Sequence, residues 1–301
     1  MEERPGNKHT TSSRLSSSKS AQYGHAGQAA AVDVGHVVQG MASQAGSSSR
    51  LSPHVVIIGG GLGGIACGIA LKTQLDFHNF TIYEKAAELG GTWRDNTYPG
   101  SACDTPSHWY SLSTELNPDW STTLAPQPEL LAYWLSLARK YDLYKHTVFN
   151  TSVVAATWNA GRHEYEVFVT EEQGGAERRS VWARAVVSVV GILSEPYTPD
   201  IKGLSTFTGP HFHSARWDHG VDVRGKKVVV VGNGASAAQF VPCLLRSAGT
   251  QVVQFCRLPN WYLYGSRADY SPRRRWVLAK VPLALRLYRL WVLLVSTAYN
   301  P

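Results

Sequence analysis

A glycine cluster that directly follows a short apolar run is the feature that most constrains the fold of this chain. Residues 54–58 (HVVII) are uniformly apolar after the first position, which predicts a buried parallel strand. Gly59, Gly61 and Gly64 then fit the pattern G-x-G-x-x-G. A helix of small residues and a second strand over residues 80–84 are expected to follow. The sequence therefore predicts a strand–helix–strand unit.

Each glycine of this pattern has its own physical task. Gly59 permits the tight turn, Gly61 lets a pyrophosphate approach the backbone, and Gly64 lets the helix pack closely on the strand. The free N–H groups at the start of the helix attract phosphate. Glu84 ends the second strand, where a carboxylate can accept hydrogen bonds from a ribose hydroxyl. We therefore expect this unit to bind a dinucleotide.

A second unit of the same kind begins at the strand 228–231 (VVVV). Gly232, Gly234 and Ala237 give G-x-G-x-x-A, an accepted variant of the pattern. The next strand is followed by Arg257, and an arginine at this place favours the 2′-phosphate of NADPH, whereas an acid would favour NAD. The residues expected to contact this nucleotide are Asn233, Gly234, Ala235, Ser236, Ala237, Ala238, Gln239, Arg257 and Leu258.

Charge and cysteine content exclude several classes of protein. The net charge is +7, but residues 272–301 alone contain six basic residues and no acid, so the remainder is nearly neutral and we expect no nucleic-acid partner. The four cysteines form no close pair, which predicts neither a metal site nor a redox dithiol and favours a reducing compartment. Because the N-terminus has no apolar signal segment, we expect a cytoplasmic protein.

The remaining segments complete the predicted order of elements. Residues 1–53 are rich in Ser, Gly, Ala and Gln, and predict a disordered tail. The other expected elements are a helix over 128–141, strands over 148–158, 165–170 and 181–190, a turn at Gly174-Gly175, and a proline-punctuated connector over 196–210.

Two longer motifs carry a resemblance to a known family. Residues 90–104 (GGTWRDNTYPGSACD) match GGxWxxxxYPGxxxD, and residues 207–218 (FTGPHFHSARWD) match FxGxxxHxxxW[P/D]. Over residues 54–301 the chain resembles the N-terminal part of a Baeyer–Villiger-type flavin monooxygenase. The resemblance implies an α/β fold of two Rossmann-like domains, truncated at the C-terminus relative to the family. An FAD-binding domain would occupy 54–200, and a partial NADP-binding domain would occupy 201–301.

The resemblance also implies roles for individual residues. Asp104 would be catalytic, because the family's aspartate acts on an active-site arginine. His213 and Trp217 would couple the two cofactor domains. The residues implied to line the FAD site, or to face the nicotinamide, are Thr92, Trp93, Arg94, Asp95, Ala102, Cys103, Asp104, Tyr110 and Val153.

The implied reaction uses FAD, NADPH and O2 to convert a ketone into an ester or lactone. None of Arg267, Arg273, Arg274 and Arg275 matches the family's catalytic arginine, so we expect that arginine to be absent from this chain. A monooxygenase acting on nitrogen or sulfur would share both glycine motifs, and a truncated remnant that only binds nucleotide is a further alternative. A disulfide reductase is excluded, because it needs a close cysteine pair beside the flavin.

The segment 276–299 is apolar with interspersed arginines, and its charges interrupt any span long enough to cross a membrane. One interpretation is an amphipathic helix that contacts a membrane surface. We favour the other, a helix that packs against a further part of the family fold.

Overall fold

Strand β1 (Val55–Ile58) lies inside a four-stranded parallel sheet of order β3-β2-β1-β7 in a computed structural model of the chain. It pairs in parallel with β2 (Phe80–Tyr83) and with β7 (Ala185–Ser188), and β2 pairs with β3 (Thr147–Val148). The structure describes residues 54–171, 178–261 and 267–299. The predicted tail over 1–53 and the turn at Gly174-Gly175 lie outside the described residues.

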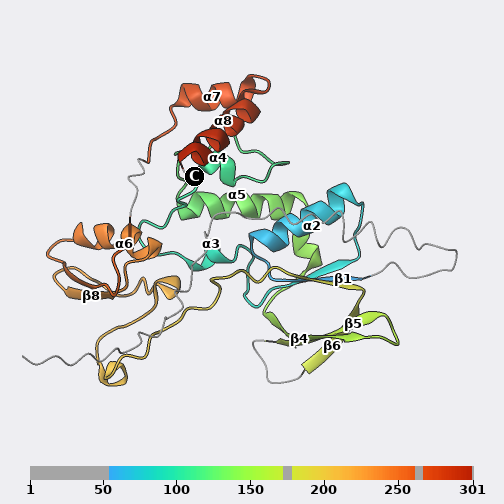
Figure 1. The fold of residues 1–301 in the computed structure, drawn as a ribbon, viewed down its shortest axis with the longest axis horizontal. Helices are drawn as coiled ribbons and strands as arrows, with labels where there is room; N and C mark the ends of the chain where they lie inside the picture. The colour runs from blue at the N-terminus through green and yellow to red at the C-terminus, as the bar shows by residue number, and fades with distance from the viewer. Residues whose placement is uncertain (1–53, 172–177, 262–266, 300–301) are drawn as a thin grey trace, which may run out of the picture. The chain divides into compact units, whose positions relative to one another are not determined.

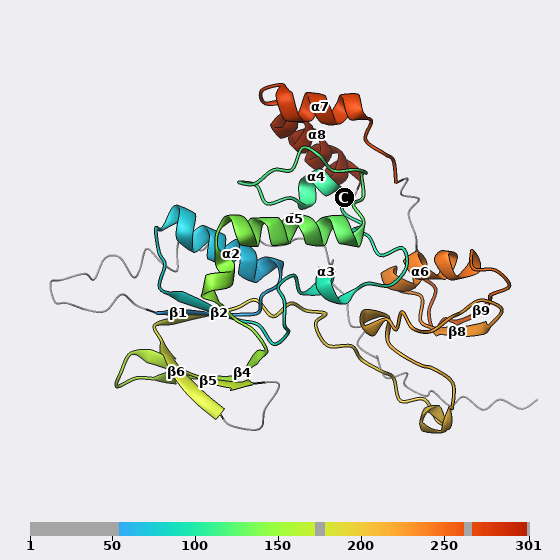
Figure 2. The same ribbon diagram turned by 180° about the vertical axis from the view of Figure 1, so that it is seen from behind.

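The two faces of this sheet are covered differently, as Figures 1 and 2 show. Val55 and Ile57 join the core formed with α2 (Leu62–Gln74) and α5 (Gln127–Lys140). Val56 points to the opposite face, because side chains alternate along a strand, and it packs on an antiparallel sheet of order β4-β5-β6. The strands of that sheet are β4 (Thr151–Asn159), β5 (Glu164–Glu171) and β6 (Arg178–Ala183).

Two of the expected strands are each divided between the two sheets, which corrects the sequence prediction. The run 148–158 contains the end of β3 and most of β4, and Asn150 separates them with a left-handed backbone (φ +52°) that asparagine tolerates. The run 181–190 contains the end of β6 and all of β7, with Arg184 between them. An apolar run shows that a segment is buried, but not which sheet it joins.

The second strand–glycine–helix unit has the predicted order. Strand β8 (Lys227–Val231) leads into α6 (Ala235–Leu245) and then to β9 (Gln251–Phe255), which pairs in parallel with β8. Val230, Phe240 and Leu244 are buried together with Tyr98 from the first half of the chain. The α/β class with two such units is therefore confirmed.

The C-terminal segment is two helices and not one. α7 (Pro272–Lys280) ends before Pro282, and α8 (Ala284–Tyr299) begins after it, because proline does not continue a helix. Arg289 of α8 donates a hydrogen bond to the carbonyl of Ser111, 3.1 Å away, and Val292 is buried. None of the helices in the described ranges is both long and apolar enough to cross a membrane.

Short helices supply the remaining regular structure. They are α3 (Thr92–Asp95), α4 (Ser107–Tyr110), and the 3-10 helices η1 (Leu143–His146), η2 (Leu204–Thr206) and η3 (Ser214–Arg216).

Candidate functional site

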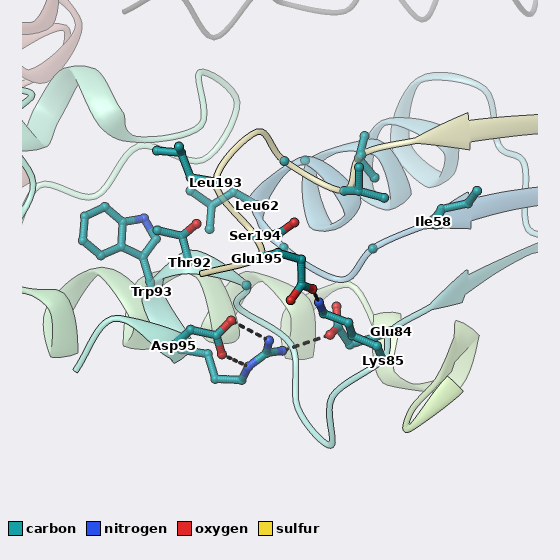
Figure 3. Close-up of a pocket in the computed structure, with 18 of the residues that line it drawn as sticks. Ile58, Leu62, Glu84, Lys85, Thr92, Trp93, Asp95, Leu193, Ser194 and Glu195 are labelled. Atoms are coloured by element: carbon teal, nitrogen blue, oxygen red, sulfur yellow. Dashed lines mark hydrogen bonds and ion pairs between the residues drawn. The ribbon is translucent and has the colours of Figure 1, made fainter. Parts of the chain in front are cut away.

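A cavity of about 430 Å³ lies where the first glycine loop meets several other segments of the chain (Figure 3). Its lining comes from the glycine loop, residues 83–85, 91–96, 151–153, 189–191, 193–195 and 215–216, and Tyr110. Of the predicted site residues, those that line it are Gly59, Gly61, Glu84, Thr92, Trp93, Arg94, Asp95, Tyr110 and Val153.

The glycine loop has the geometry that a pyrophosphate requires. Gly59 has a φ of +107°, and a Cβ added at Gly64 would lie 2.0 Å from the carbonyl oxygen of Gly59. Gly64 is therefore the close contact between helix and strand, as the sequence predicted. A Cβ added at Gly91 would lie 2.9 Å from the Cα of Gly61, so two bare backbones meet at the cavity. With the start of α2 beside them, they form a cradle that fits a dinucleotide phosphate.

Glu84 is almost fully buried, yet its carboxylate lies at the cavity. Its Oε2 accepts a hydrogen bond from the amide of Gly60 at 2.7 Å, and its Oε1 accepts from the amide of Ala86 at 2.9 Å. Arg94 Nη1 lies 3.1 Å from the same Oε1, and Arg94 Nε lies 2.8 Å from Asp95 Oδ1. A carboxylate has lone pairs for about four bonds and three are taken, so Glu84 keeps capacity for about one more, from a ribose hydroxyl.

Trp93 and Tyr110 form an aromatic wall of the cavity. The rings meet edge to face with centroids 5.8 Å apart, and Trp93 Nε1 donates a hydrogen bond to the Tyr110 hydroxyl at 3.1 Å. Burial raises the pKa of Tyr110 to about 12, so this hydroxyl stays protonated at neutral pH. Gln127, at the start of α5, donates a hydrogen bond to the carbonyl of Trp93 and fixes the backbone of this wall.

The segment 102–104, between Trp93 and Tyr110 in the sequence, does not line the cavity. Ala102, Cys103 and Asp104 all lie outside its lining, and Asp104 is exposed. Burial raises the pKa of the Cys103 thiol to about 11, which keeps it protonated. Asp104 nevertheless stays near the aromatic wall, since its charge, after the larger effect of burial, helps to raise the pKa of Tyr110.

The second glycine loop is open to solvent. A Cβ added at Gly232 or Gly234 would meet nothing within 4 Å. Asn233 donates a side-chain hydrogen bond to the carbonyl of Leu258 at 2.8 Å, which holds the loop beside the exposed Arg257. Asn233, Gly234, Arg257 and Leu258 therefore lie together near the exposed start of α6.

The five other predicted residues of this second unit lie at the start of α6. Ala235 and Ala238 are exposed and Ser236 is half-buried, whereas Ala237 is buried in the core of the unit. The side chain of Gln239, which was predicted to contact nucleotide, is hydrogen-bonded to Ala102 and Tyr98.

The predicted coupling residues flank a short helix that reaches the cavity. His213 Nδ1 accepts a hydrogen bond from the amide of Ala215 at 3.1 Å and so caps η3. Ala215 and Arg216 line the cavity, and Arg216 Nη1 lies 3.8 Å from Asp95 Oδ2. Trp217 packs on Phe240 of α6 with ring centroids 5.3 Å apart.

Sequence reasoning missed part of the lining. Lys85 and Glu195 point toward one another and form an ion pair at the cavity (Figure 3). Lys85 directly follows Glu84, so its place beside the predicted site could have been read from the sequence. Residues 189–195 follow β7, and they reach the cavity only because β7 pairs with β1, a strand order that the sequence did not show.

Comparisons with known proteins agree with these observations. A protein-family model described as FMO-like, flavin-binding monooxygenase-like, matches residues 52–275. The chain is 38% identical over 239 residues to a Baeyer-Villiger monooxygenase of Streptomyces coelicolor, a match that covers 79% of this chain and 44% of that relative. A Baeyer-Villiger monooxygenase of Pseudomonas aeruginosa is 39% identical over 235 residues, covering 78% and 43%.

Solved structures give the same result. An open crystal structure of cyclohexanone monooxygenase superposes with a TM-score of 0.69 at 29% identity, covering 80% of this chain and 46% of that one. A structure of OTEMO in complex with FAD and NADP superposes with a TM-score of 0.66 at 32% identity, covering 74% and 42%. The chain thus spans less than half the length of the relatives named here.

Proposed function

Because the chain belongs to the flavin-binding monooxygenase-like family, we propose that it binds FAD and NADPH and serves the Baeyer–Villiger oxidation of a ketone. The observation that carries this proposal is the cavity in which the bare backbones of Gly61 and Gly91, the Glu84 carboxylate and the aromatic pair Trp93–Tyr110 converge. Phosphate, ribose and a flat ring system each find a suitable partner there.

The chain's own residues would hold the flavin in two ways. Gly61 and the start of α2 would bind the pyrophosphate, while Glu84 would accept hydrogen bonds from the ribose. Arg94 balances the buried charge of Glu84, so the carboxylate stays ionised without leaving an uncompensated charge in the site. When bound, FAD would accept a hydride from NADPH and activate O2, so that one oxygen atom enters the ketone and the other leaves as water.

The second unit would hold NADPH. The open backbone at Gly234 gives access to the start of α6, and Arg257 offers its guanidinium to the 2′-phosphate. Asp104 would act on the family's catalytic arginine, which none of the arginines in this chain matches. The described cysteines are free thiols, which supports a cytoplasmic location.

The first test is a visible absorption spectrum of the purified chain, followed by anaerobic addition of NADPH. We expect flavin bands that bleach with NADPH and respond much less to the same concentration of NADH. Gly61→Ala is the matched control, because a Cβ there has room in the fold, 3.7 Å from Gly91, but would meet the pyrophosphate. A wild-type chain that stays colourless after reconstitution with FAD would contradict the proposal.

A further inference from the structure

Both polar atoms of the Gln239 side chain are hydrogen-bonded to the backbone of Ala102. Gln239 Oε1 accepts a hydrogen bond from the Ala102 amide at 3.2 Å, and Gln239 Nε2 donates one to the Ala102 carbonyl at 2.9 Å. Only one orientation of the amide satisfies both bonds, since the flipped group would place donor against donor. The Tyr98 hydroxyl donates a third bond to Gln239 Oε1 at 3.0 Å.

The backbone around Ala102 is bonded on its other edge as well. The amide of Gln127 donates to the Ser101 carbonyl at 2.9 Å, and the Cys103 amide donates to the Ala125 carbonyl at 3.0 Å. Residues 101–103 therefore behave as a central strand, because their polar groups alternate between the two sides. One neighbour is the segment 125–127, and the other is the side chain of Gln239.

The approach of this segment to α6 is close enough to need a glycine. Gly100 has a φ of +83°, and a Cβ there would lie 2.8 Å from the Gln239 carbonyl oxygen and 2.8 Å from Cys243 Sγ. The Tyr98 ring meets Phe240 edge to face with centroids 5.9 Å apart. The segment is thus seated on α6 by packing as well as by hydrogen bonds.

These contacts form a continuous path between the two nucleotide units. α6 starts at the second glycine loop and carries Gln239, which holds Ala102. The adjacent Ser101 is bonded to Gln127, whose side chain donates to the carbonyl of Trp93 in the cavity wall. The path thus ends at Trp93, in the wall of the first cavity.

We propose that Gln239 is a positioning residue that fixes the segment 98–103 between the second nucleotide unit and the wall of the first cavity. Resting on the proposed function, this role means that Gln239 sets the geometry of hydride transfer from NADPH to FAD and does not itself bind NADPH. A small error in such geometry lowers a transfer rate about 100-fold, whereas affinity depends on the contacts that remain.

The test compares Gln239→Leu with Gln251→Leu in the full chain. Gln251 is exposed on β9, and its side chain makes no hydrogen bond within the described ranges. Gln251→Leu is therefore the same substitution without the loss of hydrogen bonds to Ala102. Hydrogen exchange at residues 98–103 and alkylation of the buried Cys103 need no cofactor. Gln239→Leu should raise both rates about tenfold, and Gln251→Leu should leave them unchanged.

The second readout is rapid anaerobic reduction of bound FAD. For Gln239→Leu the limiting rate should fall about 10- to 100-fold, while FAD content and the Kd for NADPH stay within about threefold of wild type. A raised Kd with unchanged exchange at 98–103 would show a direct nucleotide ligand and overturn the proposal. Unchanged exchange with an unchanged reduction rate would overturn it too.

Tyr98→Phe gives a milder version of the same test if Gln239→Leu does not fold. It removes only the hydroxyl that bonds Gln239 Oε1, so exchange at 98–103 should rise about threefold, and no rise would overturn the proposal. If the wild-type chain takes up no FAD, only the proposed function is contradicted. The role of Gln239 in fixing residues 98–103 is still decided by hydrogen exchange at these residues and by alkylation of Cys103, neither of which needs FAD.

Discussion

The Gly60 amide lies 2.7 Å from Oε2 of Glu84 and donates a hydrogen bond to it. This bond joins the first glycine loop to the end of β2, two segments that a dinucleotide would touch at different groups. A Cβ at Gly60 would lie 3.1 Å from the Glu84 Cβ, so the two backbones also approach closely. The carboxylate is thus part of the loop's structure before any ligand binds.

Glu84→Gln should destabilise the free chain and weaken FAD binding together. In the glutamine variant the NH2 group would face a donor in either orientation, the Gly60 amide in one and the Ala86 amide with Arg94 in the other. In both orientations at least one of these donors loses its charged acceptor. We expect the free energy of unfolding in urea to fall by about 1–3 kcal/mol. Glu171→Gln, which alters an exposed ion pair with Arg179, is the control and should change stability by less than about 1 kcal/mol.

Gly64→Ala and Gly234→Ala should separate folding from nucleotide binding. The Cβ of Gly64→Ala would lie 2.0 Å from the Gly59 carbonyl oxygen, so we expect a loss of roughly 3 kcal/mol or more in unfolding free energy. At Gly234 a Cβ meets nothing within 4 Å, so the apparent Tm should hardly move. Gly234→Ala should nevertheless weaken NADPH binding, measured by titration, because the added methyl group stands where the pyrophosphate approaches. Equal Tm losses in both variants would contradict this assignment.

The local units of the fold could be predicted because their signals are local. The apolar run, the glycines and Glu84 lie within about one strand–helix–strand unit, and each fell where the pattern required. The same holds for β8, α6 and β9. The helix α5 also begins one residue before its predicted start, at Gln127, since Pro128 suits a first turn.

Pairings between distant segments could not be predicted from such signals. The division of 181–190 between two sheets depends on which strand finds β1 as its neighbour, and no residue in the run encodes that choice. Likewise, a glutamine at the fifth position of a nucleotide-binding helix resembles a ligand, and only the folded chain brings Ala102 to it. The exposed position of Asp104 is a tertiary outcome of the same kind.

Arg257→Ala should reduce the preference for NADPH over NADH. Arg257 is exposed beside Leu258, whose carbonyl is bonded to Asn233 in the glycine loop, so its guanidinium has access to a nucleotide seated there. Loss of a charge-assisted bond to phosphate should weaken NADPH binding by about tenfold or more and leave NADH binding nearly unchanged. Competitive titration of the two nucleotides measures the ratio, and Arg246→Ala, an exposed arginine at the end of α6, is the control. A parallel loss of affinity for both nucleotides would show that Arg257 acts on something other than the 2′-phosphate.

His108 should make the stability of the chain sensitive to acid. It is 1% exposed, and neither ring nitrogen has a hydrogen-bond partner in the described residues. Its ring packs edge to face on Tyr270 and Tyr288, and Arg274 lies over both tyrosine rings. Burial, and then the charge of Arg274, lower the pKa of His108 from 6.5 to about 4, so the folded chain holds it neutral.

The sign of the effect follows from this lowered pKa. Above pH 6.5 the histidine is neutral in both the folded and the unfolded chain, so its contribution is fully present there and is lost as the pH falls toward 4, where the unfolded chain binds the proton first. His108→Phe keeps the ring and loses no hydrogen bond. Urea unfolding at pH 7, 5.5 and 4.5 should therefore show the stability of wild type falling relative to the variant, by about 1–3 kcal/mol at the lowest pH. A difference that stays constant across this window would mean that His108 carries a proton, or a partner, in the folded chain.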